Sequence, residues 1–78
     1  KTVLPNYFLE PGDELFIEPV EFDADITLPA DQTILVDGTI DLGKYGRVIV
    51  TGLTVEQTES LIIERVYEIE GKRLPINV

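Results

Sequence analysis

The segment VDGTIDLGKYGRVIVTGLT, residues 36–54, alternates glycines with β-branched residues and decides how the chain folds. A phosphate-binding loop needs its glycines directly before a helix, where free amides and the helix dipole face the anion. Three of the four glycines here precede predicted strands, and only Gly52 precedes a predicted helix. Neither common phosphate-loop spacing occurs. The glycines are therefore predicted to serve turns and packing.

The dipeptide Asp37-Gly38 lies between two β-branched runs and predicts a β-hairpin. Two registers remain open. A two-residue turn places Leu35 opposite Ile40, whereas one extra loop residue places Val36 opposite Ile40. The hairpin is predicted, and its register is not.

Further strands are predicted on both sides of this hairpin. Leu15 and Ile17 alternate with polar or outward residues and predict a strand with one buried face. Pro19 has no N–H to donate, so this strand ends, bulges or lies at a sheet edge there. Residues 23–32 are polar and turn-rich and predict a loop. Residues 47–51, RVIVT, predict a strand short enough to be buried on both faces.

The apolar period changes to about 3.6 residues after Thr54 and predicts a helix that ends at Gly71. Thr54 and Gln57 have the spacing of a capping box. Residues 74–78, LPINV, predict a last strand. The stripe predicted to face the sheet consists of Val55, Thr58, Ile62, Val66 and Ile69.

Length and composition limit the chain to one small domain. Its 78 residues leave room for a single core. The predicted fold class is α+β: a small mixed β-sheet of about four to five strands, with a β-hairpin, packed against one α-helix. Because the sequence contains no methionine, we expect residues 1–78 to be one domain excised from a longer chain.

Charge is unevenly distributed along the chain. Residues 1–43 contain ten of the 15 carboxylates and a single base, Lys1. An acidic surface repels nucleic acid and anionic lipid, so neither is an expected partner. Asp23, Asp25 and Asp31 offer oxygen ligands for calcium, but their segment lacks the glycine and glutamate of a calcium loop. No metal or other cofactor is predicted.

The amino-acid composition excludes most common catalytic mechanisms. Cysteine and histidine are absent, which removes thiol nucleophiles, the commonest metal ligand and the commonest general base. Ser60 is the only serine and has no histidine partner. A carboxylate pair of the glycosidase type needs a cleft that one small sheet and one helix do not offer. No catalytic residue is predicted, and the chain is predicted not to be an enzyme.

The residues predicted to contact a ligand lie in and next to the turn GKYG, residues 43–46. Tyr7, Tyr45 and Tyr67 are the three tyrosines, and Tyr45 within this turn is predicted to be presented outward. Lys44 and Arg47 flank it. These three positions, Lys44, Tyr45 and Arg47, are the candidate contact for a glycan or a partner protein.

Three segments match one family pattern: YFLEPGDELFIEPV, residues 7–20, VDGTIDLGKYGRVIVTGLTVEQ, residues 36–57, and LPINV, residues 74–78. Together they resemble the polysaccharide biosynthesis/export family of periplasmic proteins, the Wza type. Gly43 stands where the family usually has proline, and Val20 lies one place beyond the pattern's valine. The motif residues are Pro11, Gly12, Asp13, Asp37, Gly38, Gly46, Gly52, Leu53 and Thr54.

The resemblance implies an N-terminal export-motif domain of an outer-membrane channel for capsule or exopolysaccharide. It implies a structural, non-catalytic role at the periplasmic face of the outer membrane, by ring assembly and conduit formation. The implied partners are further copies in a ring homo-oligomer, the exported polysaccharide and an inner-membrane polysaccharide co-polymerase. The alternatives are a glycan- or protein-binding module and an acidic calcium-dependent interaction domain.

Overall fold

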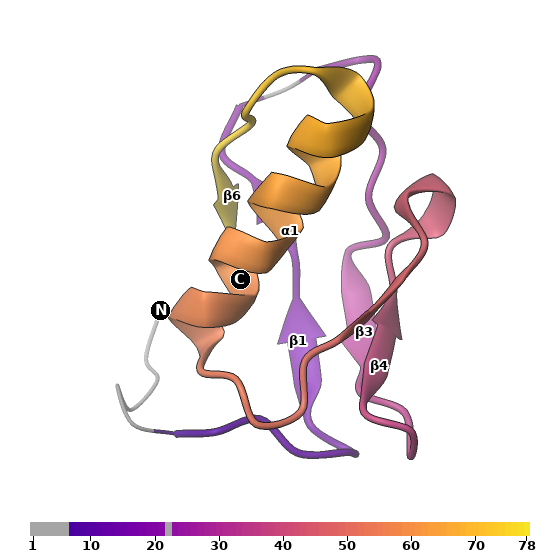
Figure 1. Ribbon diagram of the computed structural model, residues 1–78, viewed down its shortest axis with the longest axis vertical. Coiled ribbons are helices and arrows are strands. Elements are labelled where there is room, and N and C mark those ends of the chain that lie inside the picture. Colours follow the sequence, from indigo (N-terminus) through magenta and orange to yellow (C-terminus); the bar gives the residue numbers. More distant parts are fainter. Residues whose placement is uncertain (1–6, 22) are drawn as a thin grey trace.

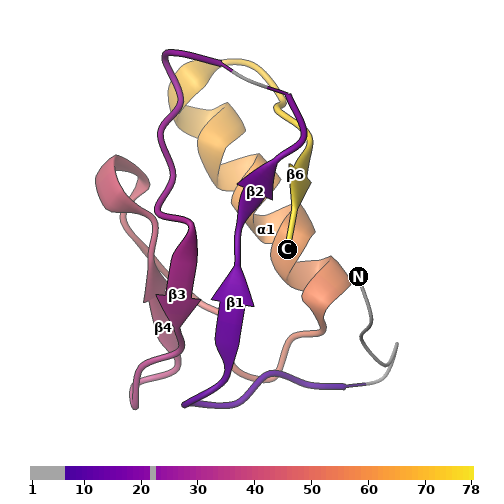
Figure 2. The same ribbon diagram turned by 180° about the vertical axis from the view of Figure 1, so that it is seen from behind.

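The computed structural model describes residues 7–21 and 23–78, which form short strands and one α-helix (Figures 1 and 2). The predicted α+β class is confirmed. In chain order the elements are β1 (Glu14–Phe16), β2 (Glu18–Pro19), β3 (Asp31–Thr33), β4 (Thr39–Asp41), the 3₁₀ helix η1 (Gly43–Tyr45), β5 (Arg47–Ile49), α1 (Val55–Glu70) and β6 (Ile76–Asn77).

The strands of the described residues pair in twos, and every pairing is antiparallel. β1 pairs with β3, β2 with β6, and β4 with β5. The structure therefore has three small sheets in place of the single mixed sheet that the sequence predicts. The first predicted strand is divided after Phe16, and its second part, β2, stops at Pro19, which has no N–H to extend the ladder.

The turn at Asp37-Gly38 has a register different from both that the sequence left open. The Gly38 N–H donates to the Leu35 carbonyl at 2.8 Å, and the Leu35 N–H donates to the Thr39 carbonyl at 3.0 Å. Leu35 therefore lies opposite Thr39 across a three-residue loop. Such a loop commonly ends in a glycine with positive φ, and Gly38 has a φ of 83°.

Both ends of α1 have the predicted caps. Thr54 Oγ1 accepts from the Gln57 N–H at 3.1 Å, and Gln57 Oε1 accepts from the Thr54 N–H at 2.9 Å. These two bonds complete the capping box. At the other end Gly71 adopts the left-handed conformation, and its N–H donates to the Tyr67 carbonyl.

The core lies between α1 and the inner faces of the strands (Figure 1). The strand predicted over residues 47–51 differs from the prediction: Val48 and Val50 are buried, but Ile49 is 68% exposed, so only one face of this segment lies on the core. The buried hydrophobic residues are Leu9, Leu15, Ile17, Ile26, Ile34, Ile40, Leu42, Tyr45, Val48, Val50, Val55, Ile62, Val66, Leu74 and Ile76.

The buried stripe of α1 ends differently from the prediction. Thr58, Ile62 and Val66 are fully buried and follow one another in steps of four, so the next position of this stripe is Glu70. Ile69 lies beside the stripe and is 54% exposed, which makes its predicted burial wrong. No helix of the described residues is long and apolar enough to cross a membrane.

Candidate functional site

Tyr45 is buried, and the prediction that it is presented outward is wrong. Its side chain is 1% exposed, and its hydroxyl donates to Glu70 Oε2 at 2.6 Å. Tyr45 is the last residue of η1, which packs against α1, so its ring closes one end of the core. A buried phenol needs a hydrogen-bond partner, and Glu70 supplies it. A sugar ring has no access to this aromatic face.

Lys44 joins the same carboxylate from the outside. Its Nζ lies 2.9 Å from Glu70 Oε2 and donates to the Asp25 carbonyl at 3.2 Å. The Lys44 ammonium also lies 5.3 Å from the centroid of the Tyr45 ring. These contacts tie together η1, the last turn of α1 and the loop that follows β2.

Arg65 completes the attachment of η1 to α1. Its Nη1 donates to the Tyr45 carbonyl at 2.9 Å, and its Nε lies 3.8 Å from Glu68 Oε1. We refer to Lys44, Tyr45, Arg65 and Glu70 as the η1 clamp. Sequence reasoning missed Arg65 and Glu70. The available signal was position, because Glu70 lies four residues after the buried Val66 on the same helix face.

Contacts within the clamp lower the pKa of Glu70 and raise the pKa values of Lys44 and Tyr45. Hydrogen bonds from Lys44, and then from Tyr45, lower the pKa of Glu70 below its ordinary value. The hydrogen bond to Glu70 raises the pKa of Lys44, and burial followed by the same carboxylate raises the pKa of Tyr45. At neutral pH Glu70 is therefore ionised while Lys44 and Tyr45 keep their protons. This arrangement fixes structure and leaves no group poised to transfer a proton near pH 7.

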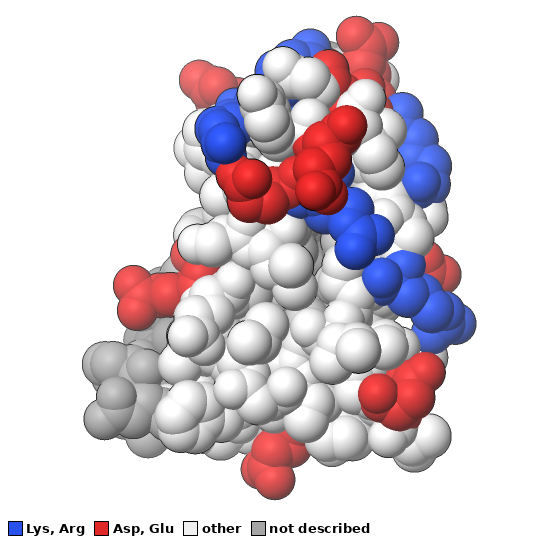
Figure 3. Space-filling view, viewed as in Figure 1, with Lys and Arg blue, Asp and Glu red and all other residues white. Residues whose placement is uncertain are grey.

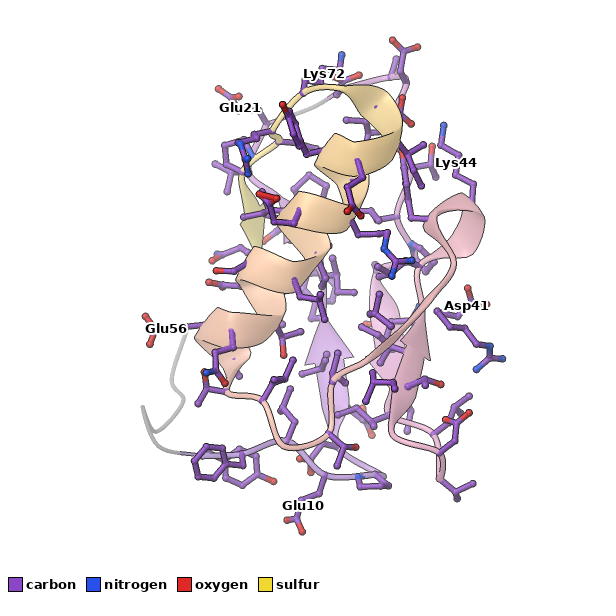
Figure 4. All side chains as sticks on the ribbon, viewed as in Figure 1. Glu10, Glu21, Asp41, Lys44, Glu56 and Lys72 are labelled. Carbon is purple, nitrogen blue, oxygen red and sulfur yellow. The ribbon has the colours of Figure 1, made fainter. Side chains whose placement is uncertain are left out.

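Arg47 lies apart from the clamp. It is exposed on β5, opposite Asp41 of β4, and its Nη1 donates to Thr39 Oγ1 at 3.2 Å. Figure 4 shows Lys44 and Asp41 on one side of the molecule and Glu56 on the other. The structure thus brings Lys44 and Tyr45 together and leaves Arg47 on an outer face. A contact role for Lys44 and Arg47 stays a prediction.

The two aspartates of the family motif hold turns. Asp13 Oδ2 accepts from the Glu10 N–H at 2.9 Å and from the Tyr7 hydroxyl at 2.7 Å. Asp37 Oδ1 accepts from the Thr39 N–H at 3.1 Å and from its hydroxyl at 2.7 Å, and these bonds lower the pKa of Asp37. Both carboxylates satisfy backbone donors next to them.

The motif glycines, like the motif aspartates, shape turns of the backbone. Gly52 has a φ of 86°, and its N–H donates to the Leu9 carbonyl at 2.9 Å. The Leu53 carbonyl accepts the returning bond from the Leu9 N–H at 2.8 Å. Pro11 and Gly12 form the turn before β1 in the same part of the fold. These residues shape the chain and do not converge on a ligand-sized site.

The structure does not group the candidate calcium ligands Asp23, Asp25 and Asp31 into a metal site. Asp23 accepts from the Asp25 N–H at 2.9 Å and forms an ion pair with Lys72 at 2.6 Å, which lowers the pKa of Asp23. Asp31 lies on β3, opposite Phe16. Across residues 7–21 and 23–78, no three acidic side chains are grouped so that they could hold a metal ion.

The fold and site together define a small α+β unit whose polar groups secure its turns and its helix end. The polysaccharide biosynthesis/export protein family matches residues 1–78, and the chain therefore belongs to this family. The resemblance drawn from the three sequence segments is confirmed, and with it a role in polysaccharide export. No curated protein sequence matches the chain.

Proposed function

We propose that residues 1–78 form a structural, non-catalytic domain of an outer-membrane channel that exports capsule polysaccharide or exopolysaccharide. The observation that carries this proposal is the family match over the whole chain. The site geometry supports a non-catalytic role, because the η1 clamp and the motif aspartates form hydrogen bonds with other groups of the same domain. We place the domain at the periplasmic face of the outer membrane.

The proposed mechanism is ring assembly around a conduit. Its partners are further copies of this chain, the passing polysaccharide and an inner-membrane polysaccharide co-polymerase. The net charge of −9 supports a passive wall, since an acidic surface repels anionic polymers and limits their adhesion.

Export in the parent cell tests this proposal. Tyr45→Ala, introduced into the full chain, removes the ring that closes the core and is expected to abolish surface polysaccharide while polymer is retained inside the envelope. Val36→Ala is the matched control, because Val36 is 97% exposed at a turn and its loss leaves the core intact. Normal export by cells whose Tyr45→Ala protein is unfolded or degraded would refute the proposal.

Fractionation tests the location separately. The full chain is expected in the outer-membrane fraction, and its residues 1–78 are expected to become accessible to protease only after the outer membrane is permeabilised. Cleavage in intact cells would contradict the periplasmic placement without affecting the role in export.

A glycan-binding module remains a second candidate on one observation. Tyr67 is 40% exposed, and the Arg73 guanidinium lies 4.3 Å from its ring centroid, while Arg73 is also ion-paired with Glu64. An exposed tyrosine combines an apolar ring with a polar hydroxyl, which suits it to an interface, here with a sugar. Calorimetry with the exported polymer tests it: a binding signal that Tyr67→Ala removes would favour this candidate over a passive wall.

A further inference from the structure

β1 and β2 follow one another along one extended segment but pair on opposite sides of it. On one side β3 pairs with β1, and the Ile17 N–H donates to the Ala30 carbonyl at 2.7 Å. On the other side β6 pairs with β2, and the Val20 N–H donates to the Pro75 carbonyl at 2.9 Å. Figure 2 shows β3 and β6 on either side of this segment. The edge of β1 that faces away from β3 therefore lies in line with β6.

This edge, which we call the outer edge of β1, carries the backbone N–H and C=O groups of Glu14 and Phe16. Backbone groups of an antiparallel strand alternate between its two sides, so positions two residues apart face the same side. Steps of two back from Val20 reach Glu18, which pairs with Asn77 of β6, and then Phe16 and Glu14. Within the described part of the chain, no strand pairs with β1 on this edge.

The direction and register of β6 decide which extended segment fits the outer edge of β1. An unpaired strand edge is a template for another strand. Glu18 pairs with Asn77, and the two strands run in opposite directions. In this register the first residue after Val78 falls opposite Phe16, and the third falls opposite Glu14. Figure 2 shows the C-terminal end beside β1, on the side away from β3.

We propose that, in the longer chain from which we expect this domain to come, the residues that directly follow Val78 extend β6 along the outer edge of β1. The first of them exchanges backbone hydrogen bonds with Phe16, and the third with Glu14. The second lies opposite Leu15, which is buried, and is apolar because cross-strand neighbours share one face of a sheet. A segment continuous with β6 also has a far higher effective concentration at this edge than a separate chain.

The pairing has a structural consequence for the whole protein. It joins the β1–β3 and β2–β6 pairs into one continuous sheet, with β1 in its centre. The part of the protein that follows Val78 is then fixed to this domain by backbone hydrogen bonds. This inference does not rest on the proposed channel, because it concerns only how the domain is connected to the rest of its own chain.

Amide hydrogen exchange in the full chain, resolved by residue, tests the pairing. We expect the Glu14 and Phe16 amides to exchange at least about a hundredfold more slowly than unpaired amides, as Ile17 does through its bond to Ala30. This protection is expected to be the same at every protein concentration. Fast exchange at Glu14 and Phe16 beside a slow Ile17 amide overturns the proposal. Protection that grows with concentration also overturns it, since a second copy would then occupy the edge.

Disulfide trapping in the full chain tests the register. Residues 1–78 contain no cysteine. Phe16→Cys, combined with a cysteine at the residue that directly follows Val78, would place two Cα atoms about 5.5 Å apart, which a disulfide can bridge. We expect an intramolecular disulfide after mild oxidation. Val36→Cys with the same second cysteine is the matched control, because Val36 is 97% exposed at the turn before Gly38. Equal disulfide yields from the two variants contradict the register.

Discussion

The two ends of this molecule are held together by different interactions. At the end that contains η1 and the last turn of α1, charged and phenolic groups join separate elements, as Lys44, Tyr45 and Glu70 do. At the opposite end, the turn at Gly38 and the segment at Gly52 are joined to their neighbours by backbone hydrogen bonds. Figure 3 shows charged atoms gathered over the upper half of one face and few over its lower half. The η1 end should therefore respond to pH through its clamp, and the opposite end mainly to backbone geometry, with Asp37, whose pKa is lowered by the hydrogen bonds from Thr39, as a titrating group there.

The largest expected effect is the loss of the Tyr45 ring. Tyr45→Ala leaves a cavity under η1 and also removes one of the two groups that bind Glu70 Oε2, so we expect the free energy of unfolding to fall by about 3 to 5 kcal/mol. Urea denaturation followed by circular dichroism measures it. A loss below about 1 kcal/mol would mean that η1 repacks over the gap and that the clamp does not close the core.

Glycine substitutions test the opposite end in a matched pair. Gly38 and Gly52 have φ values of 83° and 86°, but a Cβ on Gly38 would lie 2.7 Å from Thr51 Oγ1, whereas a Cβ on Gly52 would meet nothing within 4 Å. Gly38→Ala is therefore expected to cost about 2 to 3 kcal/mol and Gly52→Ala about 1 kcal/mol. Thermal unfolding compares them. Equal losses would show that strain in φ accounts for everything and that the Thr51 contact relaxes.

Removing only the phenolic hydroxyl should have a smaller effect. Tyr45→Phe keeps the ring in the core and deletes its hydrogen bond to Glu70, for an expected loss of about 1 to 2 kcal/mol. Tyr67→Phe is the control, because the Tyr67 side chain is partly exposed and outside the clamp. If both variants lost the same stability, the hydrogen bond to Glu70 would contribute nothing beyond a solvent-exposed hydroxyl.

The same division explains how much the sequence could predict. Local signals located the helix ends, because Thr54, Gln57 and Gly71 act within one turn of where they stand. They also located the turn at Gly38. Local signals could not predict the clamp, because Tyr45 and Glu70 are 25 residues apart and only the packing of η1 on α1 brings them together.

Strand pairing was unpredictable for a related reason. Strands of two or three residues contain too little alternation to fix a register, and their partners are chosen by the fold as a whole. A tyrosine between glycines has the local features of an exposed turn tip, and burial of its ring depends on a helix that begins ten residues later. Tyr45 is therefore excluded from the candidate contact because its ring is buried. For Lys44 and Arg47 a contact role stays a prediction.

The subtlest prediction concerns how the stability of the clamp depends on pH. The fold lowers the pKa of Glu70, so the stability that this carboxylate adds is present above its ordinary pKa of 4.5 and disappears as the pH falls through the lowered value. The fold raises the pKa values of Lys44 and Tyr45, so their contribution is present below about pH 10 and disappears as the pH rises through the raised values. Melting temperatures of the unmodified chain and of Glu70→Gln should therefore differ most between pH 6 and pH 9 and converge at both extremes. A difference in melting temperature that stayed constant from pH 3 to pH 11 would show that Glu70 stabilises the fold through packing and that its charge contributes no stability.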